Sequence, residues 1–144
     1  MKMLITAGIA VLLFSLPMAA AAGDFDGSKP LICSTGKVIE CTPEGGCQEV
    51  TPESVAVPQF LTVDLDKKII KATGKNDGDR KSIIKRLERL EGSVILQGSD
   101  EGIQDVRDSV GWSATLSEET GKFVVTASGD GVAFIVYGAC TQLP

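Results

Sequence analysis

Apolar and polar residues alternate in short runs through the last third of the chain. The runs cover residues 110–116, 123–127 and 132–137, and short polar turns separate them. Alternation with a period of two places every second side chain on one face of a β-strand. The segment 129–131 (Gly-Asp-Gly) between the last two runs is typical of a hairpin turn. The three runs therefore predict an antiparallel β-meander.

Similar runs occur earlier in the chain. Short strands are expected at residues 31–33, 37–41, 60–65, 69–73 and 93–97. Glycine and aspartate gather at 74–78, which predicts a turn after the fourth of these strands. Residues 48–58 contain two prolines and predict irregular structure with a helical turn opened by Thr51. The polar, acidic stretch 98–108 predicts a loop.

Residues 82–91 (SIIKRLERLE) fit two descriptions. Their apolar residues fall at helical spacing, and the segment is rich in good helix formers. As a strand, it would place charged residues on both faces. A turn at Gly92 and a clear strand after it favour the strand, because a meander on both sides has to be continuous and sheet context overrides local propensity. We expect a strand here, with a helix as the alternative.

The predicted fold class is all-β. About eight short strands joined as hairpins fit an antiparallel meander that forms a curled sheet or a small barrel. A closed barrel would remove the exposed strand edges. Two disulfides would stabilise either form.

The N-terminus has the pattern of a secretory signal peptide. Lys2 precedes an apolar run at 4–16, and alanines occupy 19–22. We expect residues 1–22 to be the signal peptide and 23–144 to be a single secreted β-domain, located in the periplasm or outside the cell. Outside the signal, no apolar run approaches the roughly 20 residues of a membrane-spanning helix.

Charge and composition exclude several function classes. The chain carries 14 Lys and Arg against 19 Asp and Glu and contains no histidine. An acidic surface disfavours nucleic acid and anionic membranes as partners. Without histidine, Ser-His-Asp and Cys-His catalysis and imidazole-ligated metals are excluded. We expect no metal and no cofactor, and the balance favours a protein that is not an enzyme.

The four cysteines predict two disulfides, because an exported chain with an even number of cysteines forms pairs. We expect Cys41–Cys47, which closes a short Pro/Gly turn, and Cys33–Cys140, which ties the first strand to the last. The alternatives join Cys140 to Cys41 or Cys47 and leave Cys33 to pair with a neighbour.

Few residues indicate a binding or catalytic site. Trp112 is the single tryptophan and Tyr137 the single tyrosine. Both lie on predicted strands, where such residues more often pack in the core, but they are the first candidates for lining a barrel mouth. Carboxylate pairs such as Asp64 with Asp66 are the candidates for acid–base chemistry, although a solvated hairpin edge is the simpler interpretation.

Several short segments together resemble a known group of proteins. They are DGSKPLIC (26–33), CQ (47–48), VPQFL (57–61), ILQG (95–98), GWS (111–113), TGK (120–122), GDG (129–131) and GAC (138–140). The set is similar to a group of small exported proteins of Gram-negative bacteria that has no assigned function. The resemblance implies a periplasmic or secreted location and no particular activity or catalytic residue.

These observations predict a non-enzymatic, disulfide-stabilised binding or accessory module. Its partner would be a periplasmic protein, recognised through a groove, a barrel mouth or an edge strand. One alternative is a barrel that carries a small apolar ligand in its interior, which requires a cavity lined by inward residues. A second alternative is a carboxylate-based hydrolase, which requires two acids to converge in a cleft.

Overall fold

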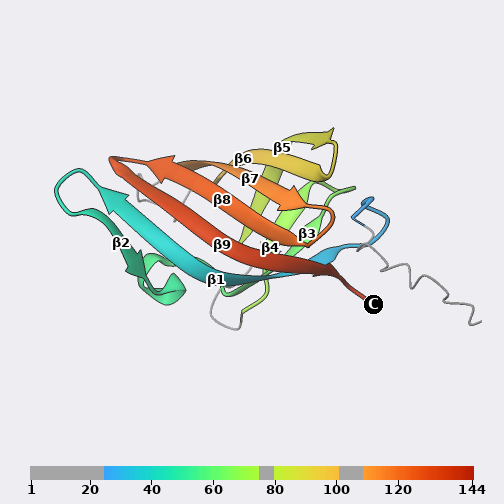
Figure 1. Cartoon of the computed structure of the whole chain (residues 1–144), viewed down its shortest axis with the longest axis horizontal. Coiled ribbons are helices and arrows are strands. Elements are labelled where there is room, and N and C mark those ends of the chain that lie inside the picture. The colour runs from blue at the N-terminus through green and yellow to red at the C-terminus, as the bar shows by residue number, and fades with distance from the viewer. Residues whose placement is uncertain (1–24, 75–79, 101–108) are drawn as a thin grey trace, which may run out of the picture.

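The computed structural model describes residues 25–74, 80–100 and 109–144, and it consists of β-strands with one short 3₁₀ helix (Figure 1). The predicted signal peptide, most of the turn at 74–78 and most of the loop at 98–108 lie outside the described residues. The strands are β1 (Leu31–Thr42), β2 (Gly46–Val50), β3 (Phe60–Asp64), β4 (Ile69–Ala72), β5 (Lys81–Leu90), β6 (Ser93–Asp100), β7 (Val110–Ser117), β8 (Lys122–Gly129) and β9 (Val132–Gln142), and the helix is η1 (Pro52–Val55).

The sheet closes into a barrel. From β3 to β9 each strand pairs antiparallel with the next one in the sequence, and β9 then pairs with β1 along most of its length. β1 completes the ring by pairing with β3 through residues 31–34. The second half of the same edge of β1 pairs with β2, which is an additional strand outside the ring. The predicted all-β antiparallel fold is confirmed, and of the two predicted forms the barrel is the one found.

Both expected disulfides are present. Cys33 bonds Cys140, which lies directly opposite it on β9, and Cys41 bonds Cys47, directly opposite it on β2. The first bond locks the strand pair that closes the barrel, and Cys33 is buried. The second holds the additional strand, and Cys47 is exposed. Two disulfides indicate an oxidising, extracytoplasmic environment.

Inward side chains fill the middle of the barrel. An eight-stranded barrel is just wide enough for its own side chains or for one small ligand. Here the buried apolar residues form one cluster with contributions from every barrel strand except β4, and the described residues include no buried polar or charged side chain. Its members are Phe25, Leu31, Cys33, Val38, Val63, Leu65, Ile84, Val94, Leu96, Ala114, Leu116, Phe123 and Val136.

β1 is one long strand, whereas the sequence predicted two short ones. Its register against β9 shifts between Thr35 and Lys37, so Gly36 forms a bulge. A bulge adds a residue to one strand and reverses the alternation of inward and outward side chains beyond it. This is why Cys33 and Val38, an odd number of residues apart, both point inward and are buried. The break in the alternation of apolar and polar residues between 33 and 37 is therefore the position of the bulge and not the end of a strand.

Residues 82–91 form strand β5 up to Leu90, and they do not form a helix. A second bulge, at Lys85, shifts the register between Ile84 and Arg86. Ile84 and Leu87 therefore face the interior together, although they are three residues apart. Apolar residues three positions apart are typical of one face of a helix, and this is why the sequence of 82–91 also fits a helix.

Two further segments differ from the sequence prediction. β2 was expected to be irregular, and the structure places its start at Gly46, inside the turn closed by the second disulfide. β6 continues to Asp100, into the segment predicted as a loop. The helical turn opened by Thr51 is found: the Thr51 side chain accepts a hydrogen bond from the backbone N–H of Ser54. Nothing helical in the described part of the chain is long and apolar enough to cross a membrane.

The N-terminal segment seals one end of the barrel. Phe25 is 5% exposed and packs over Gly121 in the β7–β8 turn. Its carbonyl accepts a hydrogen bond from Arg89 Nη2 at 2.8 Å, while Arg89 Nη1 lies 2.6 Å from Glu118 Oε1. The Pro30 carbonyl accepts from the backbone N–H of Leu143. Both ends of the described chain are therefore fixed at this end of the barrel.

Candidate ligand-binding site at the barrel mouth

The barrel end opposite Phe25 has a different set of inward residues, and we call it the mouth. β4, β6 and β8 end there, and β5, β7 and β9 begin there. Inward positions near the middle of each strand carry aliphatic residues. Near the mouth they carry aromatic, small and charged residues instead.

A row of alternating small and large side chains crosses four neighbouring strands at the mouth. Gly98 on β6 lies opposite Trp112 on β7, Trp112 opposite Ala127 on β8, and Ala127 opposite Phe134 on β9. A Cβ atom on Gly98 would overlap the Trp112 ring, so the glycine is what allows the indole to lie across β6. The two aromatic rings are partly buried and pack on the core.

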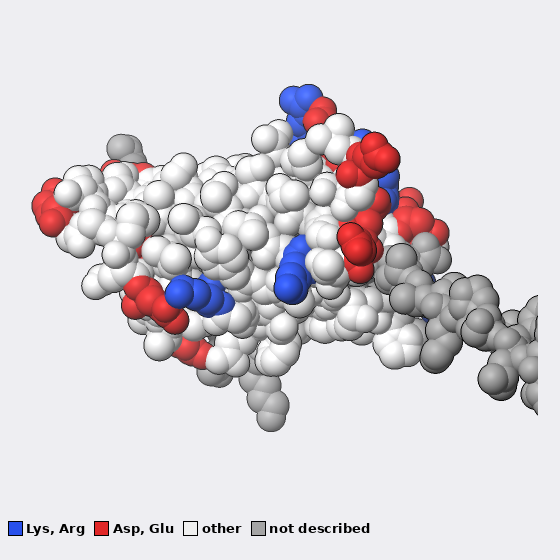
Figure 2. Space-filling view, in the orientation of Figure 1, with Lys and Arg blue, Asp and Glu red and all other residues white. Residues whose placement is uncertain are grey.

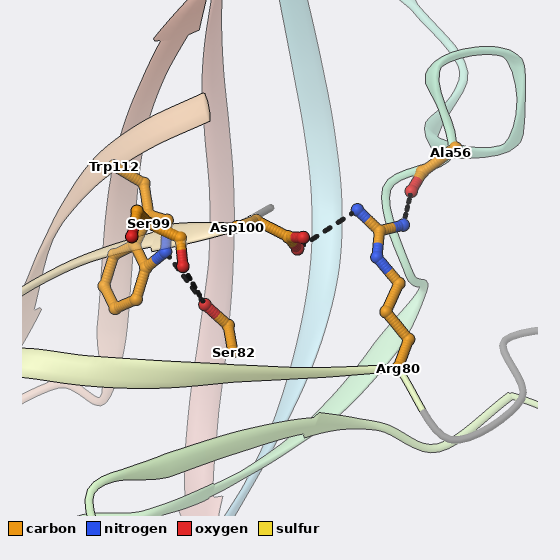
Figure 3. Close-up of polar contacts among 6 residues, drawn as sticks. All are labelled: Ala56, Arg80, Ser82, Ser99, Asp100 and Trp112. Atoms are coloured by element: carbon orange, nitrogen blue, oxygen red, sulfur yellow. Dashed lines mark hydrogen bonds and ion pairs between the residues drawn. The ribbon is translucent and has the colours of Figure 1, made fainter. Parts of the chain in front are cut away.

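Hydrogen bonds fix the orientation of the Trp112 ring. Its Nε1–H donates to Ser82 Oγ on β5 at 3.0 Å, and the Ser82 hydroxyl donates to the carbonyl of Ser99 on β6 at 3.2 Å (Figure 3). A buried or half-buried indole N–H normally has such a partner. The chain of bonds holds the ring against the sheet and leaves its position well defined before any ligand binds.

Arg80, the residue before β5, extends toward the end of the helix η1. Arg80 Nη1 donates to the Ala56 carbonyl, just after η1, at 2.5 Å, and Nη2 lies 3.4 Å from Asp100 Oδ2 (Figure 3). The side chain of Arg80 is 42% exposed and that of Asp100 is 19% exposed. This pair lies beside the Trp112–Ser82 contact and supplies a cationic group that water can reach.

Glu40 lies at the other side of the aromatic row. It is directly opposite Phe134 on β9 and faces the same side of β1 as the buried Val38. Its side chain is half-buried and has no ion pair among the described residues. The aromatic row is thus flanked by Arg80 with Asp100 on one side and by a carboxylate on the other.

The carboxyl groups with a resolved pKa shift lie at the sealed end and not at the mouth. A general acid needs a desolvated carboxyl group with a raised pKa. The resolved carboxyl shifts are downward: Ser28, by its hydrogen bonds, lowers the pKa of Asp26, and the Lys67 ammonium and then its backbone N–H lower the pKa of Asp64. Within the described residues no cluster of three or more potential metal ligands occurs.

The structure does not bring the two aromatic residues singled out in the sequence together. Trp112 lies at the mouth, on the inner face of the sheet. Tyr137 lies next to the buried Val136, on the outer face, and is 41% exposed. It is paired with Val124 on one side and Lys37 on the other. Strand alternation separates the two rings, so a ligand at the mouth does not touch Tyr137.

Sequence reasoning missed the other residues of the mouth, namely Arg80, Asp100 and Phe134. One signal was available for Phe134, because it lies two residues before Val136 and therefore shares its face. Arg80 follows closely after the segment predicted as a turn (74–78), and Asp100 lies within the segment predicted as a loop (98–108). Nothing in the sequence shows that these segments are neighbours.

Two surface hollows lie away from the mouth floor. One of about 490 Å³ lies between the β1–β2 and β8–β9 turns and is lined by Pro43 and Asp130 among others. The second, of about 760 Å³, lies at the sealed end between the N-terminal segment and the β3–β4 turn, with Asp26, Lys68 and Arg89 in its wall. Of the charged side chains in the wall of the second hollow, Asp64 and Lys67 form an ion pair with each other.

Comparisons of the chain with protein-family models, with curated proteins and with solved structures find no match.

Proposed function

We propose that this protein is a non-enzymatic binding module of the bacterial periplasm or extracellular medium, and that it binds a small amphipathic molecule at the barrel mouth. The flat apolar part of the ligand would stack on Trp112 and Phe134 over Ala127. A polar or anionic group of the ligand would bind Arg80. Ligand sites commonly combine such an apolar floor with a few placed polar groups.

The contrast between the two barrel ends carries this proposal. At one end, Phe25 covers the core and its carbonyl is bonded to Arg89. At the other end, the core meets two partly exposed aromatic rings and a cation that is 42% exposed. Stability alone gives no reason to place around one opening a tryptophan, an arginine and Glu40, which has no ion pair among the described residues.

The alternative of a ligand carried deep inside the barrel has less support. The middle of the interior is occupied by aliphatic side chains that are almost completely buried, including Val38, Val94 and Leu96. A deep ligand would have to displace them, at the cost of well-packed contacts. A ligand bound against the partly exposed rings would leave these aliphatic side chains in place.

The hydrolase alternative also has less support. Glu118 is paired with Arg89, and Asp64 with Lys67. Asp66 is exposed. Asp64 and Asp66, the acid pair considered in the sequence, therefore do not form a desolvated cleft of the kind that glycosidases use.

The test uses 8-anilinonaphthalene-1-sulfonate, an amphipathic anion with a flat ring system. Because Trp112 is the single tryptophan, energy transfer from tryptophan to the dye reports that dye is bound to the barrel, and the variants locate the site. We expect transfer in the folded, oxidised protein. Ala127→Leu should remove most of it by filling the space between the rings, and Arg80→Ala should weaken dye binding about threefold, as expected for an exposed charge.

The matched control is Tyr137→Ala, which removes an exposed aromatic ring from the outer face. It should leave dye binding unchanged, and circular dichroism should show that all three variants are folded. Equal energy transfer in the wild type and Ala127→Leu would contradict a site at the mouth. Loss of transfer in Tyr137→Ala alone would place the site on the outer wall.

A further inference from the structure

β2 is the one strand of the described sheet that has a neighbour on a single side. Every strand of the closed ring is paired on both edges, whereas β2 pairs with β1 alone. An edge strand presents unpaired backbone N–H and C=O groups that can bind another extended chain. In Figure 1, β2 lies at the outside of the barrel, beside the long strand β1.

The register shows which backbone groups face the open edge. Cys41 and Cys47 are directly opposite each other, with Cα atoms 4.0 Å apart. In antiparallel sheets, directly opposite residues are about 4.5 Å apart in non-hydrogen-bonded pairs and about 5.5 Å apart in hydrogen-bonded pairs. Cys47 is therefore in a non-hydrogen-bonded pair, and so is Glu49, two residues further on. The N–H and C=O of both residues point away from β1.

The open edge is held rigidly. The Cys41–Cys47 disulfide fixes its register, and the Thr42 hydroxyl accepts a hydrogen bond from the Gly45 N–H in the preceding turn at 3.1 Å. η1, capped by Thr51, follows directly. A strand that is already ordered loses little conformational entropy on binding. The usual protection by lysine or proline is absent from the sequence Gly46–Val50.

Charge indicates the kind of partner. Glu44 in the turn, Glu49 on β2 and Glu53 on η1 are all exposed. Among the residues that the structure describes, Lys37 is the one cation that pairs with this group. Its Nζ lies 2.8 Å from Glu49 Oε2, and both side chains of that pair are more than half exposed. Figure 2 shows acidic side chains at both ends of the molecule, this end included, whereas the broad face over β1, β8 and β9 is mostly uncharged. A second copy of this chain would bring like charges together, and a basic segment would not.

We propose that β2 is a docking edge for an extended, basic segment of a partner protein. The segment would add to the sheet as a strand antiparallel to β2, with hydrogen bonds to the backbone of Cys47 and Glu49. It would place a Lys or Arg opposite Glu49 and, two positions later, a small apolar residue against the Cys41–Cys47 disulfide. This edge is separate from the mouth, so the proposal does not depend on the proposed ligand.

The test uses a fluorescein-labelled peptide, acetyl-TKTVTK-amide, and fluorescence anisotropy at low salt. We expect saturable binding to the oxidised protein. A peptide with glutamate at both lysine positions should not bind. A peptide with N-methyl groups on the two amides that face β2 should bind about thirtyfold more weakly, because two backbone hydrogen bonds of about 1 kcal/mol each are lost.

Protein variants locate the site. Glu49→Pro removes an N–H that points away from β1, so it should keep the β1–β2 pairing and reduce peptide affinity about tenfold. Glu49→Gln keeps the backbone and should weaken binding about threefold. Thr126→Val, on the outer face of β8, is the control and should have no effect. Amide exchange of Glu49, slowed by the peptide in the wild type, gives a second measurement that does not depend on a variant.

Three results would overturn the proposal. The first is absence of binding by the basic peptide. The second is equal binding to the wild type and to Glu49→Pro. The third is a dimer in sedimentation equilibrium that Glu49→Pro dissociates, because this would make a second copy of the chain the occupant of the edge.

Discussion

The two ends of the barrel are built from the same strands, and they differ in what their inward residues do. At the sealed end, Phe25 continues the core, Cys33 is bonded to Cys140, and Arg89 bonds both a carbonyl and Glu118. At the mouth end, the aromatic rings remain partly exposed, and the second disulfide, which holds β2, lies on the surface.

The difference separates stability from recognition within one small domain. Contacts at the sealed end hide apolar surface and satisfy polar groups, and this is what stabilises a fold. Contacts at the mouth fix the positions of Trp112 and Arg80 without burying them. Variants at the sealed end should therefore change the free energy of unfolding, and matched variants at the mouth should mainly change binding.

The two disulfides give the largest expected contrast. Replacing both Cys33 and Cys140 with serine opens a loop between residues 107 positions apart, which in the chain-entropy model costs about 4 to 5 kcal/mol of unfolding free energy. Replacing Cys41 and Cys47, 6 positions apart, should cost about 2 kcal/mol. Urea unfolding of the two double variants measures both values.

If the Cys33/Cys140 variant does not fold, stepwise reduction of the wild type gives the same comparison. Trapping of free thiols followed by mass spectrometry should show that Cys41 and Cys47 react first, because Cys47 is exposed and Cys33 is 1% exposed. Earlier reaction of Cys33 and Cys140 would contradict the assignment of the sealed end as the stable one.

A pair of phenylalanines gives the next contrast. Phe25→Ala should lower the unfolding free energy by about 3 kcal/mol, the lower end of the range for a buried phenylalanine, because Phe25 is at the end of the core. Phe134→Ala removes a partly exposed ring and should cost about half as much. Phe134→Ala should also reduce binding of the naphthalene dye, and Phe25→Ala should not.

Thermal unfolding and the dye assay, applied to both variants, measure this contrast. A Phe134→Ala variant as unstable as Phe25→Ala, with dye binding intact, would show that the residues at the mouth belong to the hydrophobic core and do not form a binding site. The two ends would then differ in appearance and not in role.

The sequence predicted the fold best where strand alternation is uninterrupted. β7, β8 and β9 alternate without bulges and without charges in their interiors, so each was found. β7 and β8 have nearly the predicted bounds, whereas β9 continues five residues beyond the predicted end, to Gln142. Prediction was poor at the bulges, Gly36 and Lys85, since an extra residue reverses the faces and period-two analysis assumes that they do not reverse. β2 was missed because its first residue is a glycine inside a turn.

The candidate site was predictable only in part. Strand position placed Trp112 near an opening, but it also suggested Tyr137. Trp112 is level with Phe134 on β9, and Tyr137 is three residues after Phe134, so Tyr137 lies on the other face of the sheet. Arg80 and Asp100 meet because β5 and β6 are neighbours with a particular register. That register depends on a bulge, so the pair could not be found from local sequence.

The smallest expected effect is electrostatic and lies at the sealed end. Asp64 Oδ1 accepts from the Lys67 backbone N–H at 2.9 Å, and Oδ2 lies 2.8 Å from Lys67 Nζ. These bonds lower the pKa of Asp64 below 3.8 in the folded protein. A carboxyl group with a lowered folded-state pKa stabilises the fold above its unfolded pKa, and this stabilisation is lost as the pH falls through the folded-state value.

Asp64→Asn should therefore cost about 0.5 kcal/mol at pH 7, a small value because the Lys67 side chain is largely exposed and the pair is screened by water. The difference from the wild type should shrink as the pH is lowered below about 4 and vanish once Asp64 is protonated in both states. Urea unfolding at a series of pH values measures this, with Asp66→Asn as the control for a neighbouring exposed carboxylate. A cost that stays constant down to pH 2 would mean that the asparagine disturbs the β3–β4 turn by its shape, and that charge at the sealed end contributes nothing to its stability.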